Sequence, residues 1–250
     1  MFIDTHCHLS REDYDDIDLV IKENKEAGVS KIIISGCSNE WIDESLELSK
    51  KYKDVYVTLG YHPSEVEYVN DQLLDELRDK LKYNKVVGLG EIGLDYYYGK
   101  DNKKEQISLF EKQLEIAEEM GLVVVIHSRD ATEDTINCLK KYNVTGVIHC
   151  FSGSVETANI YVNMGYKLGI GGVVTFKNSK LSDVVKDVGL ENIVLETDSP
   201  YLAPTPFRGQ KNSSKYIPLI AEYIADFMNT SVENVADITT NNACNLFDLN

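Results

Sequence analysis

The sequence of 250 residues has few basic side chains: 25 lysines and arginines stand against 41 aspartates and glutamates. The resulting formal net charge of −16 is the opposite of what a protein that coats nucleic acid with a positive surface needs. A substrate that carries phosphate would therefore have to be held locally, by metal ions and a few arginine or lysine side chains.

Cysteines are also scarce, and so are long apolar runs. The five cysteines are scattered and include no C-x-x-C pair, which argues against a disulfide framework and indicates a reducing compartment. No run approaches the roughly 18 apolar residues of a membrane span, and the opening MFIDTHCHLS lacks the basic and apolar regions of a signal peptide. We expect a cytoplasmic protein with no membrane contact and no evident obligate protein partner.

Eight short apolar runs, each typical of a strand, alternate with polar stretches of helical periodicity. Strands that alternate with helices form parallel units, and eight units in about 250 residues is the size of a (β/α)8 TIM-type barrel. A doubly wound open sheet is the alternative, because periodicity alone does not show that a sheet closes. The runs cover residues 2–8, 31–36, 55–62, 86–93, 123–128, 146–151, 166–172 and 193–199.

Helix boundaries are marked by capping and terminating residues. Ser10 predicts the start of a first helix and Gly28 its end, and Gly121 ends a periodic stretch that follows the fourth strand. After the eighth run, a proline-rich loop over 200–206 precedes two extra C-terminal helices, near 214–228 and 232–247. Because no linker interrupts the chain, we expect a single domain over residues 1–250.

The segment from Gly88 to Gly93 fits G-x-G-x-x-G, the fingerprint of a dinucleotide site. That fingerprint needs a helix to open at the third glycine, so that the amino end of the helix faces the pyrophosphate. Here the sequence Leu-Asp-Tyr-Tyr-Tyr follows, and a carboxylate, Glu91, occupies the loop where pyrophosphate would lie. We interpret the match as chance.

Imidazole and carboxylate side chains stand at the ends of the first, fourth, fifth, sixth and eighth runs. The carboxyl ends of parallel strands meet at one rim, and these side chains bind divalent metals. Six ligands are too many for one tetrahedral catalytic zinc but fit two metals bridged by a carboxylate, for which Glu91 is the natural candidate. The six are His6, His8, Glu91, His127, His149 and Asp198.

Two of these signals rest on the two-residue period of a strand. His6 and His8 would leave the first strand on the same face, although most short histidine pairs are incidental. Asp198 follows Glu196 by two residues, and its alternative role is to cap a helix before Pro200. Glu196, one pleat deeper, is expected to orient a ligand histidine.

Eight segments resemble one known family in order along the whole chain: FIDTHCHL, GYHP, GEIGLDYY, IHSRDA, HCFSG, ETDSPYLAP, FRG and NNACNLF. In these segments the sequence resembles the TatD family of metal-dependent deoxyribonucleases, within the amidohydrolase-like barrel superfamily. The resemblance implies a distorted TIM barrel and divalent metal ligands at the six positions above. It also implies hydrolysis of DNA with Mg²⁺ or a similar divalent ion, often in the 3′→5′ exonucleolytic direction. From the resemblance and the number of ligands, we expect two divalent ions per chain, with Mg²⁺, Mn²⁺ and Zn²⁺ as candidates.

The candidate substrate-binding residues are His62, Arg129 and Arg208. His62 resembles the histidine that the family carries after the third strand, and a purely structural strand-end residue is the alternative. The two arginines suit phosphate because guanidinium binds it bidentately, and surface ion pairing is their alternative role. The sequence departs from the family at Ser64 and Tyr98.

We expect a two-metal phosphodiesterase in which a metal-activated hydroxide attacks phosphorus, with Glu91 and Asp198 as catalytic residues. Asp198 would also accept the proton of the water. The expected substrate is DNA, as single strands or frayed ends. The alternatives are a small-molecule amidohydrolase or lactonase on the same barrel, which the acidic composition favours, a D-aminoacyl-tRNA deacylase, and a non-catalytic metal-binding protein.

Overall fold

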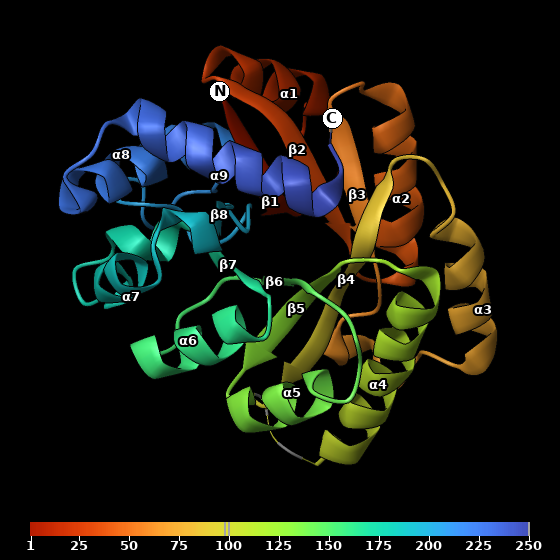
Figure 1. Cartoon of the computed structure of the whole chain (residues 1–250). Helices are drawn as coiled ribbons and strands as arrows, with labels where there is room; N and C mark the ends of the chain where they lie inside the picture. The colour runs from red at the N-terminus through yellow and green to blue at the C-terminus, as the bar shows by residue number, and fades with distance from the viewer. Residues whose placement is uncertain (98, 100, 250) are drawn as a thin grey trace. The chain divides into compact units, whose positions relative to one another are not determined.

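The computed structural model describes residues 1–97, 99 and 101–249, and its strands lie in one sheet in the order β1 to β8 (Figure 1). The pairs β1–β2, β3–β4, β4–β5, β5–β6 and β7–β8 are parallel. Cys7 on β1 pairs in parallel with Ser199 beyond β8, which returns the last strand to the first. The predicted (β/α)8 barrel is confirmed. The strands are β1 Phe2–Cys7, β2 Val29–Gly36, β3 Val55–Leu59, β4 Val86–Asp95, β5 Val124–Arg129, β6 Gly146–Ile148, β7 Lys167–Ile170 and β8 Ile193–Leu195.

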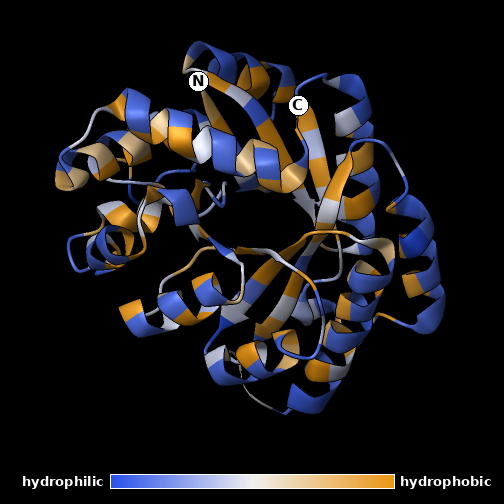
Figure 2. Cartoon of the chain, in the orientation of Figure 1, coloured by the Kyte–Doolittle hydropathy of each residue, from blue (hydrophilic) through white to orange (hydrophobic). Residues whose placement is uncertain are grey.

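The helices follow the strands and bury one apolar face each, so that hydrophobic and hydrophilic residues alternate along them (Figure 2). The two C-terminal helices were predicted closely: α9 spans the expected residues, and the other is divided into a 3₁₀ turn, Ser214–Tyr216, and α8. The α-helices are α1 Ile17–Glu26, α2 Asn39–Lys51, α3 Asp71–Lys80, α4 Lys103–Met120, α5 Thr132–Leu139, α6 Val155–Asn163, α7 Leu181–Val188, α8 Ile217–Met228 and α9 Val232–Phe247.

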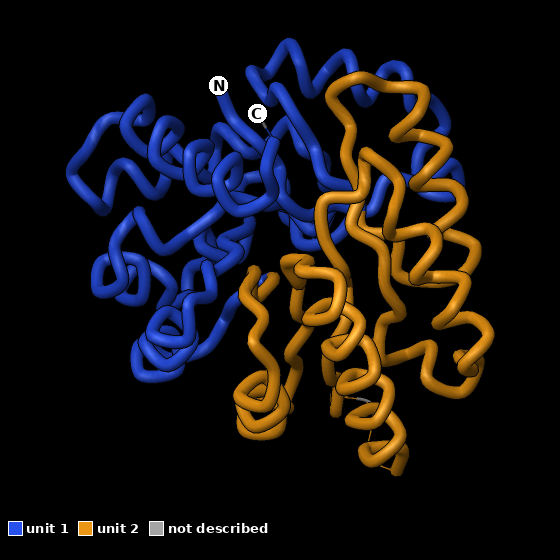
Figure 3. Tube along the Cα trace, turned by 45° about the vertical axis from the view of Figure 1, so that its right-hand side comes forward, with its two compact units in different colours: residues 1–34, 150–250 blue, residues 35–149 orange. Residues whose placement is uncertain are grey.

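The chain divides into two compact units (Figure 3). Unit 1 is built from both ends of the sequence, Met1–Ile34 and Cys150–Asn250, and unit 2 is the continuous segment Ser35–His149. Unit 1 contains β1, β7 and β8, and unit 2 contains β3 to β6. The single domain over 1–250 stays a prediction. Within the described part of the chain, every helix is too short or too polar to cross a bilayer.

The predicted start of the first helix at Ser10 is wrong. The Ser10 hydroxyl does accept a hydrogen bond from the backbone N–H of Asp13 at 3.1 Å, but it closes only a turn. The helix begins at Ile17, because Asp16 caps it by accepting the N–H of Leu19 at 2.9 Å. The predicted terminator Gly121 is confirmed as the left-handed residue after α4, with φ of 64°.

The sixth and eighth strands end earlier than the apolar runs that predicted them. β6 stops at Ile148 and β8 at Leu195. Beyond these ends, Cys150 and Asp198 have φ of 45° and 54°, which is incompatible with extended backbone. The placement of Glu196 and Asp198 on one face of a strand is therefore wrong, and both side chains project from irregular backbone.

The G-x-G-x-x-G segment lies inside β4, and no helix opens at its third glycine. Its glycines allow β4 to approach β5 closely. A Cβ atom on Gly90 would lie 2.6 Å from the Cβ of Val125, and one on Gly93 would lie 1.9 Å from the carbonyl oxygen of His127. This approach places Glu91 beside His127.

Helix α4 holds the ends of two strands through a pair of glutamines seven residues apart. The Gln113 side chain accepts the N–H of Tyr61 at 2.7 Å and donates to its carbonyl at 2.9 Å. Gln106 makes the same pair of bonds to the backbone of Asp95, both at 2.9 Å. Tyr61 precedes His62, and Asp95 ends β4, so both clamps act on backbone next to candidate site residues.

We predict that Gln113→Leu destabilises the protein by about 2–5 kcal/mol, because it leaves two buried backbone groups of Tyr61 without their partner. Urea unfolding of both proteins measures the difference. Gln72→Leu, on the exposed face of α3, is the matched control and should change stability by less than about 0.5 kcal/mol. Equal stability of the Gln113 variant and the wild type would contradict the clamp.

Candidate metal centre

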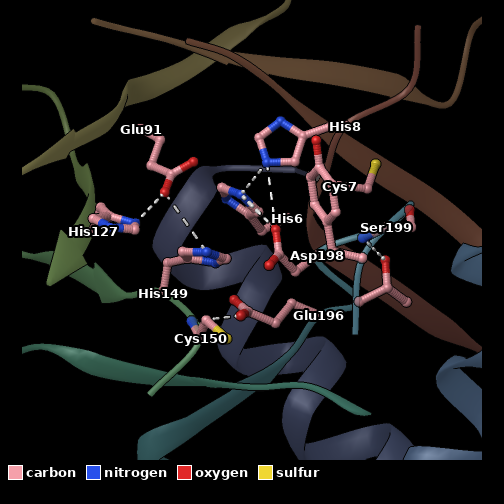
Figure 4. A network of polar contacts seen from close by, with 12 residues as sticks. His6, Cys7, His8, Glu91, His127, His149, Cys150, Glu196, Asp198 and Ser199 are labelled. Carbon is pink, nitrogen blue, oxygen red and sulfur yellow. Dashed lines mark hydrogen bonds and ion pairs between the residues drawn. The ribbon is translucent and has the colours of Figure 1, made fainter. Parts of the chain in front are cut away.

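In unit 1, three of the predicted ligands converge where β1 and β8 end (Figure 4). The Nε2 atoms of His6 and His8 lie 3.3 Å apart. The Oδ1 atom of Asp198 lies 3.4 Å from Nε2 of His8 and 3.8 Å from Nε2 of His6. The loop beyond β8 is fixed to β1, because the backbone N–H of Asp198 donates to the His6 carbonyl at 3.0 Å. We call these three side chains the unit 1 group.

The spacing of the unit 1 group fits a single divalent ion. Metal–nitrogen and metal–oxygen bonds of about 2.1 Å in a tetrahedral site place neighbouring ligand atoms about 3.4 Å apart. The three separations, 3.3, 3.4 and 3.8 Å, lie around that value. Two imidazole nitrogens and a carboxylate oxygen are also a suitable donor set for Zn²⁺ or Mn²⁺.

Asp4 supports this group from the interior of β1. Its carboxylate is fully buried and accepts the N–H and the hydroxyl of Thr197 at 3.0 and 2.6 Å, and the N–H of His6 at 3.3 Å. These hydrogen bonds lower the pKa of Asp4, but burial outweighs them and raises it to about 7. Asp4 thereby ties the backbone before Asp198 to the backbone of His6.

Glu196 is fully buried, and its Oε1 atom accepts the backbone N–H of Cys150 at 2.6 Å. It was expected to orient a ligand histidine, and this bond fixes the residue directly after His149. Glycine is needed at position 169 on β7 to make room for the carboxylate, because a Cβ on Gly169 would lie 2.1 Å from Oε2 of Glu196.

In unit 2, a second group of three gathers around Glu91, a carboxylate of β4 that is 3% exposed. Its Oε1 atom lies 2.8 Å from Nδ1 of His127 and 3.7 Å from Nε2 of His149 (Figure 4). Their ligand atoms lie close enough together for one ion. We call Glu91, His127 and His149 the unit 2 group. His62 stands beside it, with Nε2 3.9 Å from the same Glu91 oxygen.

Asp95 is a site residue that the sequence analysis missed. Its Oδ2 atom lies 3.1 Å from Nε2 of His127. A carboxylate that accepts the Nε2 hydrogen leaves Nδ1 as the lone-pair nitrogen, which is the form a metal requires. The signal was available, since Asp95 is a carboxylate at the end of a strand, but the predicted run stopped at Gly93.

The two arginines predicted to bind phosphate are exposed and stack on aromatic rings. The guanidinium of Arg129, at the end of β5, lies 3.6 Å from the ring centroid of Tyr97. That of Arg208 lies 4.1 Å from the ring centroid of Phe176. Tyr98, where the sequence departs from the family, lies outside the described residues.

The acidic neighbours of His127 change its pKa and so make the stability of the protein depend on pH. Burial lowers the pKa of His127, but the hydrogen bonds to Asp95 and Glu91 outweigh it and raise the pKa to about 9. In metal-free protein, the folded state therefore keeps His127 protonated to a higher pH than the unfolded state, in which the histidine pKa is about 6.5. This stabilisation is complete below pH of about 6.5 and is lost as the pH rises through about 9.

We predict that Asp95→Asn lowers the pKa of His127 in metal-free protein and flattens this loss of stability. NMR of the imidazole nitrogens measures the pKa over a range of about pH 5–10, which includes the reference histidine value. Urea unfolding in the presence of chelator measures the stability. Asp79→Asn, which changes an exposed acid of α3, should alter neither. A wild-type pKa near the ordinary value, unmoved by Asp95→Asn, would exclude the proposed pairing.

Comparison with known proteins identifies the chain. A family model described as TatD related DNase matches residues 3–248. The chain belongs to the TatD family. The uncharacterized metal-dependent hydrolase YabD of Bacillus subtilis (strain 168) is 39% identical over 255 residues, which cover 100% of both chains. This TatD family chain is therefore a metal-dependent hydrolase.

Solved structures of the TatD family share the fold over the full length. The crystal structure of YjjV, a TatD homologue from Escherichia coli K12, has a TM-score of 0.94 at 33% identity and covers 100% of this chain and 98% of its own. A TatD family hydrolase from Entamoeba histolytica has a TM-score of 0.89 at 25% identity, with 98% and 97% covered.

Proposed function

We propose that this TatD family hydrolase cleaves phosphodiester bonds of DNA, as a 3′→5′ exonuclease on single strands or frayed ends. The observation that carries the proposal is the pair of ligand groups, each with three donor atoms spaced for a divalent ion, in a chain that matches the TatD related DNase model. Divalent ions are the usual means by which an enzyme clamps a phosphoryl group.

The proposal assigns one ion to each group, with Mg²⁺, Mn²⁺ and Zn²⁺ as the candidates. Glu91 is proposed as a ligand that both ions share. Its support is the family resemblance, which implies a metal ligand at Glu91, and the chemistry of a carboxylate, whose two oxygens can each bind an ion. The donor sets fit, because both groups combine imidazole nitrogen with carboxylate oxygen.

Bound ions would supply a water of lowered pKa and would stabilise the charge that develops on the phosphoryl oxygens. The side chains of the protein have three further tasks. Asp198 accepts the proton released in the reaction. Its carboxylate is 15% exposed, so that water can reach it. Asp95 keeps the imidazole of His127 in one orientation. Glu196 holds the backbone that follows His149.

The charge of the chain restricts how DNA is held. A net charge of −16 argues against binding through a long basic groove. We propose that the strand is held through one or two phosphates at the ions, together with Arg129, Arg208 and His62. A short grip of this kind suits exposed strand ends better than duplex interiors. The five free cysteines support the proposal that the enzyme acts in the cytoplasm.

We predict two divalent ions per chain in the fully loaded wild type, and weaker binding of both after Glu91→Gln. Elemental analysis of the loaded and dialysed proteins gives the stoichiometry. Glu115→Gln, on the exposed face of α4, is the control and should keep full loading. One ion in the wild type, together with unchanged loading in the Glu91 variant, would contradict a shared ligand.

We predict that metal-reconstituted protein shortens single-stranded DNA from its 3′ end. Digestion of 5′-labelled and 3′-labelled strands shows the polarity. Asp198→Asn should lower the rate at least a hundredfold, a loss typical of removing an acid–base group, whereas Asp226→Asn on α8, which makes the same change on an exposed acid, should not. If neither strand is cut while a lactone, an amide or a D-aminoacyl ester is hydrolysed, the alternative substrates replace DNA.

A further inference from the structure

Tyr201 presents a large aromatic ring to solvent beside the unit 1 group. It follows Asp198 by three residues, and 52% of its surface is exposed. Its ring centroid lies 6.0 Å from that of His8, with an interplanar angle of 64°, so that the two rings meet edge to face. The ring therefore stands next to a candidate metal ligand that is itself only 6% exposed.

The backbone of Tyr201 is held firmly although its side chain is exposed. Its N–H donates to the carbonyl of Asp198 at 2.9 Å, and its carbonyl accepts from Nδ2 of Asn212 at 2.6 Å. Asn212 is fully buried, and the same amide nitrogen donates to the carbonyl of Thr197 at 2.8 Å. One buried side chain thus holds the backbone on both sides of Asp198.

An exposed aromatic ring beside the unit 1 group could bind nucleic acid without positive charge, of which the chain has little. Base stacking on an aromatic side chain needs no positive charge and accepts every base, because every base has a π face. A chain with a net charge of −16 needs such a contact more than a basic nuclease does. Leu202, the next residue in the sequence, is also 40% exposed.

We propose that Tyr201 is a stacking platform for the nucleobase next to the scissile phosphate. The inference rests on the proposed hydrolysis of DNA and adds the part of the substrate that the ring recognises. Aromatic residues are also exposed elsewhere, for example Tyr223, which is 42% exposed on α8 and meets the ring of Phe227 edge to face. Tyr201 differs from it in its contact with His8 and in the hydrogen bonds that anchor it to Asp198 and Asn212.

The test compares strands that differ only in the base. The substrates are a short single strand of thymidines and the same strand with abasic residues at both ends. The variants are Tyr201→Leu, which keeps apolar bulk without a π face, and Tyr201→Phe, which keeps the π face. Tyr223→Leu is the control for loss of an exposed tyrosine. The measurements are kcat/KM for cleavage of each strand and the affinity for each strand by fluorescence anisotropy.

We expect Tyr201→Leu to lower kcat/KM on the thymidine strand about tenfold or more, in line with the contribution of one stacked base. On the abasic strand it should change kcat/KM less than about twofold. Tyr201→Phe should match the wild type on both strands, as should Tyr223→Leu. The wild type should prefer the thymidine strand by about the factor that Tyr201→Leu loses.

Two results would overturn the stacking role while leaving the proposed function intact. An equal loss on both strands would mean that Tyr201 supports His8 or the fold, and no loss on either strand would mean that the ring does not touch the base. If the wild type neither binds nor cleaves either strand, the proposed function fails and the stacking role with it. If it binds without cleavage, the binding ratio of the two strands decides the role of Tyr201 by the same criteria.

Discussion

A backbone N–H or C=O group that is buried without a partner costs about 1–3 kcal/mol, and the carboxyl end of a strand produces such groups where metal ligands have to stand. In unit 2, helix α4 meets this cost with Gln106 and Gln113, which each take up the N–H and the C=O of one strand-end residue. The residues so held are Asp95, which contacts His127, and Tyr61, which precedes His62. The hydrogen bonds that complete the fold therefore also set the positions of the candidate site.

Unit 1 solves the same problem with different side chains. Asp4 accepts two N–H groups and a hydroxyl, Asn212 donates to two carbonyls, and Glu196 accepts the N–H of Cys150. All three residues are fully buried, so each hydrogen bond acts where water cannot replace it. Together they fix the irregular backbone on which Asp198 stands, which a regular strand would have fixed through its neighbours.

The gathering of candidate ligands within each unit was readable from the sequence, because apolar runs mark buried strands and residues at or near the carboxyl ends of parallel strands meet at one rim. The ends of β6 and β8 were not readable, because the positive φ of Cys150 and Asp198 leaves no trace in hydropathy. Asp95 was missed because the glycine that precedes it by two residues resembled the end of a run. The clamps by Gln106 and Gln113 depend on contacts across 11 and 52 positions, which no local pattern contains.

The division of unit 1 into two segments of sequence has a consequence for synthesis of the protein. His6 on β1 is hydrogen-bonded to Asp198, which follows it by roughly 190 positions in the sequence. Unit 2, by contrast, is one continuous segment. A ribosome that adds about 5–20 residues per second needs on the order of 10–40 s to make the intervening chain. Ser35–His149 has all its own strands once residue 149 has been made, whereas the first histidines lack the carboxylate of Asp198 until residue 198 follows. The candidate ligands of unit 1 therefore come together among the last contacts to form on the nascent chain.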